Sequence, residues 1–136
     1  PAPSAATAST TEADAHGLGV ALGRIMGGSR RTAKAAALVA VTRLVDGETV
    51  RHAVGGRFRA KDGIVMLTDT RLIVANDREW DPEVVVIDDL DAAEIEHWIE
   101  RRAAILRITF DEEAHVVDRI NDFGIAETLV EAFRNR

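Results

Sequence analysis

The stretch that decides the fold is GIVMLTDTRLIVAND, residues 63–77, where two apolar runs flank a short polar segment. The runs cover residues 64–67 and 72–75. Short apolar runs bounded by turn-forming residues are typical of β-strands joined in a hairpin. If Asp69 and Thr70 form the turn, residues whose numbers sum to 139 face each other across the two strands. The stretch therefore predicts both a hairpin and its register.

Both faces of this hairpin are apolar. On one face Met66 lies opposite Ile73, and the other face carries the pairs Leu67–Leu72 and Val65–Val74. A strand pair that is apolar on both sides needs a cover on each side. We expect the face of Met66 and Ile73 to be covered by the helix predicted at 30–45, or else by interaction with a second copy of the chain.

The polar segment between the strands admits a catalytic and a structural interpretation. A catalytic loop would hold a nucleophile or a base, whereas Thr68, Asp69 and Thr70 are common turn formers. Arg71 is suited to binding nearby carbonyl or carboxylate oxygens. We interpret Thr68, Asp69 and Arg71 as a structural turn.

The same kind of pattern recurs along most of the chain. After Gly47 short β-rich runs arrive at intervals typical of an all-β sandwich or barrel. A helix follows, capped at Asn121 or Asp122, with an apolar stripe of Ile125, Leu129, Val130 and Phe133. Seven strands are predicted, at 49–59, 64–68, 71–76, 83–88, 93–101, 105–110 and 115–120.

The N-terminal third differs in composition. Residues 1–14 are rich in Pro, Ala, Ser and Thr and are expected to be a disordered tail. Residues 15–45 form a predicted helical segment, with a short helix at 15–28 and a longer one at 30–45. Leu38, Val41 and Val45 are the expected apolar stripe of the longer helix. Residues 46–136 are predicted to be the stable domain.

Three stretches suggest a family. LVDGETV (44–50), GIVMLTDTRLIVAN (63–76) and the segment from VVVIDDLDAAEIE (84–96) through LRITF (106–110) resemble bacterial pleckstrin-homology-like domains of the YokE-like kind. The likeness covers residues 40–136. It implies a mainly β fold, a bent seven-stranded antiparallel sandwich or partly open barrel with a C-terminal capping helix, preceded here by the N-terminal helical segment. It also implies that the protein is not an enzyme.

Composition narrows the function classes. The chain has 136 residues, 46% hydrophobic and 29% charged, with a net charge of −6. Excess negative charge argues against nucleic-acid binding. No apolar run approaches a membrane span, no signal peptide is apparent, and cysteine is absent. We expect a cytoplasmic protein without disulfides.

No catalytic or metal-binding set can be assembled from the predicted strands. Serine occurs only at positions 4, 9 and 29, before the predicted domain, and cysteine and tyrosine are absent. Glu94-x-x-His97 and Glu112-x-x-His115 have the spacing of di-iron ligands on helices. On strands, however, residues three apart point to opposite faces. We therefore expect no catalytic residues, no metal and no cofactor.

One basic strip offers a functional alternative. In GRFRAK (56–61) Arg57, Arg59 and Lys61 alternate, so a continuous strand would aim all three to one side. Such a strip can bind an anion or a lipid headgroup, or it can pair with neighbouring carboxylates. Our leading expectation is a non-catalytic module that binds a protein partner or itself. Anion binding or membrane-surface contact through the strip is the alternative.

Overall fold

The computed structural model describes residues 16–24 and 27–136. For residues 27–32 it describes the backbone alone. The tail predicted at 1–14 lies outside the described residues. The described chain is mainly β, with one antiparallel seven-stranded sheet that does not close. Its helices are α2 (Leu18–Gly23), α3 (Gly27–Val41) and α4 (Phe123–Arg134), with a short 3₁₀ turn η1 (Leu90–Ala92).

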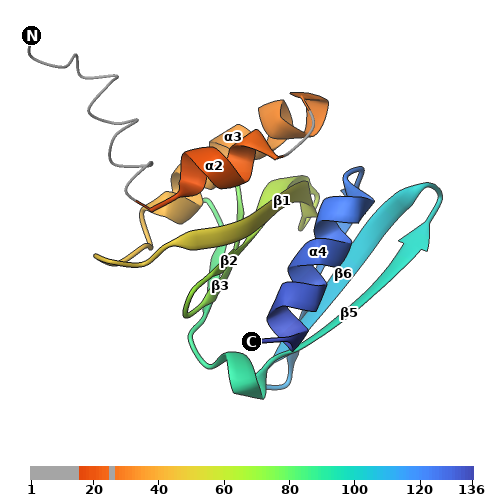
Figure 1. Ribbon diagram of the computed structural model, residues 1–136. Helices are drawn as coiled ribbons and strands as arrows, with labels where there is room; N and C mark the ends of the chain where they lie inside the picture. The colour runs from red at the N-terminus through yellow and green to blue at the C-terminus, as the bar shows by residue number, and fades with distance from the viewer. Residues whose placement is uncertain (1–15, 25–26) are drawn as a thin grey trace, which may run out of the picture.

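All seven predicted strands are present, with ends shifted by a few residues. The sheet order is β4-β3-β2-β1-β7-β6-β5, so β4 and β5 are its two edges. Figure 1 shows the strong bend of the sheet, with β1–β3 on one side of α4 and β5 and β6 on the other. The strands are β1 (Val50–Phe58), β2 (Lys61–Thr68), β3 (Leu72–Asn76), β4 (Val84–Ile87), β5 (Glu94–Glu100), β6 (Ala103–Phe110) and β7 (Glu113–Ile120).

The hairpin register predicted from residues 63–77 is confirmed. β2 and β3 pair Leu67 with Leu72 and Met66 with Ile73, and every pair sums to 139. A one-residue slip would exchange the two faces, so the apolar residues on both sides hold this register.

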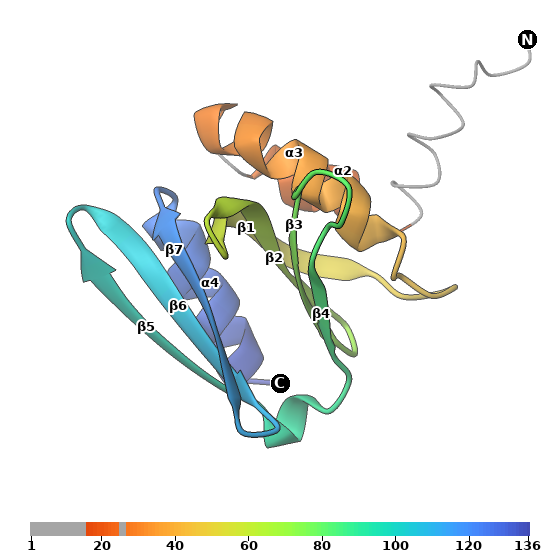
Figure 2. The ribbon, with the colours of Figure 1, turned by 180° about the vertical axis from the view of Figure 1, so that it is seen from behind.

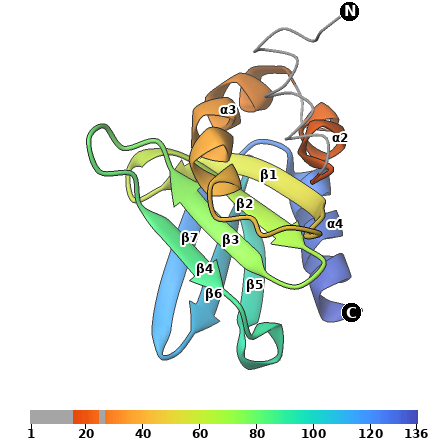
Figure 3. The same ribbon diagram turned by 90° about the vertical axis from the view of Figure 1, so that its left-hand side faces the viewer.

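The two faces of this hairpin belong to two different cores. Val65, Leu72 and Val74 face the inside of the bent sheet, where they pack with residues of β5–β7 and α4. Ile64, Met66 and Ile73 face outward and pack under α2 and α3. In Figure 3, α3 lies across β1, β2 and β3. The sheet half formed by β1–β3 is therefore covered on both sides.

Helix α3 contacts the sheet through alanines. Ala33, Ala36, Ala37 and Ala40 are at most 1% exposed. The apolar stripe predicted through Leu38, Val41 and Val45 is wrong, because Leu38 is 61% exposed and the helix ends at Val41, before Val45. Small side chains let the helix axis approach a sheet whose own side chains are large, and this contact decides which face is buried.

Helix α4 is close to the predicted one. Leu129, Val130 and Phe133 are buried in the inner core, whereas Ile125 is only partly buried and Ala126 is fully buried. The helix contacts β1, β5 and β6, and it fills the space between the two halves of the bent sheet (Figure 1).

The bend depends on a close approach of two strands. β1 pairs with β2 along its length and with β7 only at Arg57 and Phe58. A Cβ atom at Gly56 would lie 2.7 Å from the Asp118 carbonyl oxygen. Glycine at this position therefore allows β7 to cross β1 closely enough for the sheet to continue.

Among the described residues, no helix combines the length and apolarity needed to cross a bilayer.

Candidate functional site

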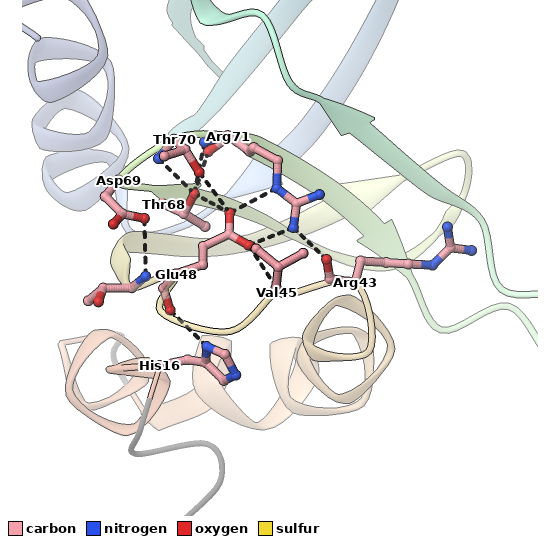
Figure 4. A network of polar contacts seen from close by, with 9 residues as sticks. His16, Arg43, Val45, Glu48, Thr68, Asp69, Thr70 and Arg71 are labelled. Atoms are coloured by element: carbon pink, nitrogen blue, oxygen red, sulfur yellow. Dashed lines mark hydrogen bonds and ion pairs between the residues drawn. The ribbon is translucent and has the colours of Figure 1, made fainter.

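The predicted turn surrounds a buried carboxylate. Glu48, just before β1, is 3% exposed, and Arg71 donates to it from Nε at 2.9 Å and from Nη2 at 2.5 Å. The Thr68 hydroxyl donates to the same carboxylate at 2.6 Å, and the Val45 N–H donates at 3.1 Å. Figure 4 shows these donors converging on Glu48. This is a bidentate arginine–carboxylate pair with its remaining acceptor positions occupied.

The turn itself is organised by Thr68. Its hydroxyl oxygen accepts the N–H groups of Thr70 and Arg71 at 3.2 and 2.8 Å. Asp69 accepts the Thr49 N–H at 3.1 Å and donates its own N–H to the Thr49 carbonyl. The structure therefore brings Thr68, Asp69 and Arg71 together at one turn, each with a bonding role.

The cluster also ties the N-terminal helices to the sheet. Arg71 donates to the carbonyl oxygen of Arg43, in the segment after α3. His16, just before α2, makes a 2.7 Å contact from Nδ1 to the Glu48 carbonyl, and its own carbonyl accepts the Val50 N–H. Glu48 and Arg71 thus join the start of α2, the end of α3 and the β2–β3 turn at one point.

The electrostatics of Glu48 suit a structural role. Burial alone would raise the pKa of Glu48, but hydrogen bonds from Arg71, Thr68 and the Val45 N–H outweigh it and lower the pKa from 4.5 to about 2. A carboxylate that is ionised and fully bonded has no free electron pair with which to take a proton from a substrate. The cluster therefore holds α2, the segment after α3 and the β2–β3 turn together, and Glu48 is not placed to act as a general base.

The basic strip departs from its expected geometry. β1 ends at Phe58, and Arg59 and Ala60 both have positive φ, 52° and 67°, as in a two-residue hairpin turn. Arg57 is therefore paired in register with Asp62, and Lys61 with Phe58. Because neighbours along a strand alternate faces, Arg57 and Lys61 lie on opposite faces of this hairpin. The three basic residues do not share one strand face.

Carboxylates surround the basic strip. Arg59 forms an ion pair with Glu83 at 2.5 Å, and its guanidinium lies 4.8 Å from the centre of the Phe58 ring. A shallow hollow of about 430 Å³ beside the turn is lined by Arg57, Ala60, Lys61, Asp62, Asp77 and Glu79. Two cations facing three carboxylates give an anion little attraction.

The two Glu-x-x-His pairs do not converge. Glu94 and His97 lie three residues apart on β5, so they point to opposite faces, and Glu112 lies in the turn before β7. Within the described part of the chain no three His, Asp or Glu side chains gather as a metal-binding group.

A surface that sequence reasoning missed lies on the outer face of β5–β7. Trp98 is 40% exposed and Val116 is 44% exposed, and Ile105 is paired in register with Trp98. Arg107, opposite both Glu96 and Val116, forms a 2.6 Å ion pair with Glu96 and lies 6.0 Å from the centre of the Trp98 ring. We call Trp98, Ile105, Arg107 and Val116 the outer patch.

The outer patch is open, in contrast to the outer side of β1–β3. In Figure 2 the outer face of β6 and β7 is turned to the viewer, with α4 behind it. None of the described helices packs on this face. The signal in the sequence was weak: β5 reads Glu-Ile-Glu-His-Trp-Ile-Glu, in which a tryptophan replaces the charged residue expected on the exposed face.

The fold and these surfaces define a mainly β domain with two helical covers and one open sheet face. No protein-family model matches the chain, and none of the curated proteins compared with it matches either.

Proposed function

We propose that this protein is a non-catalytic binding module that acts through protein–protein contact or self-association at the outer patch. The observation that carries the proposal is the exposure of Trp98 and Val116 on a sheet face that no described helix covers. Tryptophan and arginine, which stand side by side in the outer patch, are enriched among the residues that carry most of the binding energy in protein interfaces.

The remaining polar chemistry supports the same proposal. The polar cluster centred on Glu48 is buried, and the carboxylate oxygens of Glu48 already accept four hydrogen bonds. The described sheet and its C-terminal helix are compatible with a pleckstrin-homology-like sandwich. We propose that the chain is related to pleckstrin-homology-like domains, a fold family often used for binding.

The test uses the outer patch and a matched control surface. Immobilised wild-type protein and the Trp98→Glu/Val116→Lys variant are exposed to native lysate, and retained proteins are identified by mass spectrometry. Leu38→Lys, on the exposed side of α3, is the control. The proposal predicts one or more proteins retained by wild type and control but lost from the patch variant. Identical sets from all three would refute the outer patch as the binding surface.

The alternative, a weak anion or lipid-headgroup binder through Arg57, Arg59 and Lys61, has less support. Glu83 neutralises Arg59, and acidic residues share the hollow with the other two. Sedimentation with phosphatidylserine vesicles at low salt tests it, because exposed charges attract most strongly where the Debye length is long. Binding that Arg57→Ala/Arg59→Ala/Lys61→Ala abolishes would favour the alternative.

A further inference from the structure

The β5 strand forms a free edge of the sheet along its whole length. Among the described strands it pairs with β6 alone, residue by residue from Glu94 to Glu100. In Figure 2 β5 lies at the left margin of the sheet, with no other strand beyond it. The backbone N–H and C=O groups along a free edge have no partner in the sheet, so they can pair with a strand from another molecule.

The β5–β6 turn decides which backbone groups face the free edge. Arg101 and Arg102 have φ of 51° and 64°, as in a two-residue turn, so Glu100 and Ala103 form its hydrogen-bonded closing pair. Hydrogen-bonded and non-hydrogen-bonded pairs alternate along an antiparallel ladder. The residues whose backbone groups turn away from β6 are therefore the alternate ones, Ile95, His97 and Ile99.

Helix α4 occupies one of these backbone groups and leaves others open. Arg134 donates from Nη2 to the Ile95 carbonyl oxygen at 2.9 Å, which agrees with a carbonyl that faces the edge. Among the described residues, no hydrogen bond outside the ladder reaches the backbone of His97 or Ile99. Each of these two residues therefore offers one donor and one acceptor to an added strand.

β5 lacks the features that usually block an edge strand. Natural sheets protect their edges with proline, lysine, bulges or short length. β5 has seven residues, EIEHWIE, without proline or lysine, and its register with β6 is continuous. The other edge strand, β4, has only four residues and begins two positions after Pro82. β5 is therefore the edge that is open to a further strand.

The side chains of β5 specify which strand fits beside it. Because neighbours alternate faces, the outer face carries three exposed glutamates and a tryptophan, Glu94, Glu96, Trp98 and Glu100. On the inner face Ile95 is buried and His97 is partly buried, whereas Ile99 is 61% exposed. An added strand would meet carboxylates on one side and an exposed isoleucine on the other.

Two of these carboxylates are available to a partner. Arg107 of β6 forms an ion pair with Glu96. Among the described residues, no cation lies within ion-pair distance of Glu94 or Glu100. A basic side chain on an added strand would be the direct cross-strand neighbour of these glutamates, and opposite charges in that position stabilise a strand pair.

The same glutamates disfavour a second copy of the chain as the added strand. In a full-length antiparallel pair of two β5 strands, Glu94 of each copy would lie opposite Glu100 of the other. Like charges directly opposite each other destabilise a strand pair. The charges of β5 therefore select a basic strand from a different chain.

We propose that the partner is an extended segment of another protein, in which basic and apolar residues alternate, and that it adds to β5 as a further antiparallel strand. Its basic side chains lie beside the glutamates of the outer face. Its apolar residues lie opposite His97 and Ile99 and exchange backbone hydrogen bonds with them. This inference rests on the proposed function, because Trp98 of the outer patch belongs to β5, and it names the class of partner.

Fluorescence anisotropy with labelled, end-blocked synthetic peptides tests the proposal on the whole chain. A peptide in which lysine alternates with valine should bind saturably. A peptide in which glutamate alternates with valine should not bind, because its carboxylates would face those of β5. The same lysines and valines arranged in two blocks should bind at least about tenfold more weakly, since a blocked sequence cannot keep its charges on one face.

Backbone methylation separates strand addition from simple charge attraction. In the proposed arrangement the valine N–H groups bond to β5, whereas the lysine N–H groups point away from it. N-methylation of the valines should therefore abolish binding, and N-methylation of the lysines should preserve most of it. Equal binding of the two methylated peptides would overturn strand addition.

Variants of the protein test the edge and its charge separately. Ile99→Pro removes an N–H that faces the free edge and should abolish binding, while the ladder with β6 remains. Glu94→Lys/Glu100→Lys should exchange the preference, so that the glutamate–valine peptide binds instead. Asp46→Lys/Glu79→Lys changes two exposed carboxylates outside β5 and should bind as wild type does. Circular dichroism checks that each variant is folded.

Two results would overturn the basic strand as partner. One is that the lysine–valine peptide does not bind at low salt, and the other is that the glutamate–valine peptide binds wild type equally well. Neither result touches the proposed function, which fails only if the outer-patch variant retains the same lysate proteins as wild type.

Discussion

At the scale of single residues, the pair of Glu48 and Arg71 links the β2–β3 turn to the segment between α3 and β1. The Glu48 side chain is 1% exposed and that of Arg71 is 17% exposed. A charge left alone in such a site is costly because neither water nor a counter-ion replaces the lost partner. The same two residues hold the segment after α3 and the start of β1 in place.

Glu48→Gln should lower the free energy of unfolding by about 3 kcal/mol, because it leaves the partly buried Arg71 guanidinium without an anion. Urea denaturation followed by circular dichroism measures the change. Glu96→Gln is the matched control, since the Glu96–Arg107 pair is exposed and should be worth less than about 1 kcal/mol. Equal effects of the two substitutions would contradict the structural role of Glu48.

The same carboxylate should make stability depend on pH. The pKa of Glu48 is about 2 in the folded protein against an ordinary value of 4.5. A depressed acid pKa adds stability above the ordinary value, and that stability is lost as pH falls from 4.5 toward 2. Denaturation midpoints measured across this range should fall more steeply for wild type than for Glu48→Gln. Parallel curves would show that Glu48 has no such linkage.

At the scale of elements, the contact between α3 and the sheet depends on small side chains. Ala36 is fully buried against a face that includes Met66 and Ile73, both also fully buried. The sequence predicted a cover for this face. It did not predict that alanines, rather than the larger residues of the helix, would form the contact, because alanine is also favoured on exposed helix faces.

Ala36→Leu should destabilise the protein by about 1–3 kcal/mol, since a larger side chain must push α3 away from the sheet. Ala35→Leu places the same side chain on the exposed side of the helix and should change stability by less than about 0.5 kcal/mol. Thermal denaturation of both variants provides the comparison. A larger loss for Ala35→Leu would mean that α3 packs through its other face.

At the scale of the whole molecule, the N-terminal helices and the sheet share a core. Leu18 and Ala21 of α2 join the alanines of α3 in the cluster that covers Ile64 and Ile73. That residues 46–136 form a stable unit by themselves stays a prediction, and the shared core sets a condition on it. The fragment must expose an apolar sheet face that the whole chain buries.

Fragment 46–136 should unfold at a lower urea concentration than 16–136 and should bind a hydrophobic dye. The physical reason is that burying a single Met or Ile side chain is worth about 1.5–3 kcal/mol, and several such side chains lie under α3. Dye fluorescence and urea titration of the two fragments are the measurements. Matching midpoints without dye binding would show that the sheet is stable without its outer cover.

Local patterns in the sequence were sufficient to predict the strands, the β2–β3 register and the presence of helices α3 and α4. Alternating or continuous apolar runs and turn formers involve neighbouring residues, so their geometry is encoded where they stand. The tertiary structure alone decided the rest. Glu48 meets Arg71 across 23 positions. Arg59 does not share a strand face with Arg57 and Lys61, because a two-residue turn replaces a straight strand. Trp98 stays exposed because none of the described helices packs on its face of the sheet. Each depends on the path of the chain between distant segments, which side-chain periodicity does not specify.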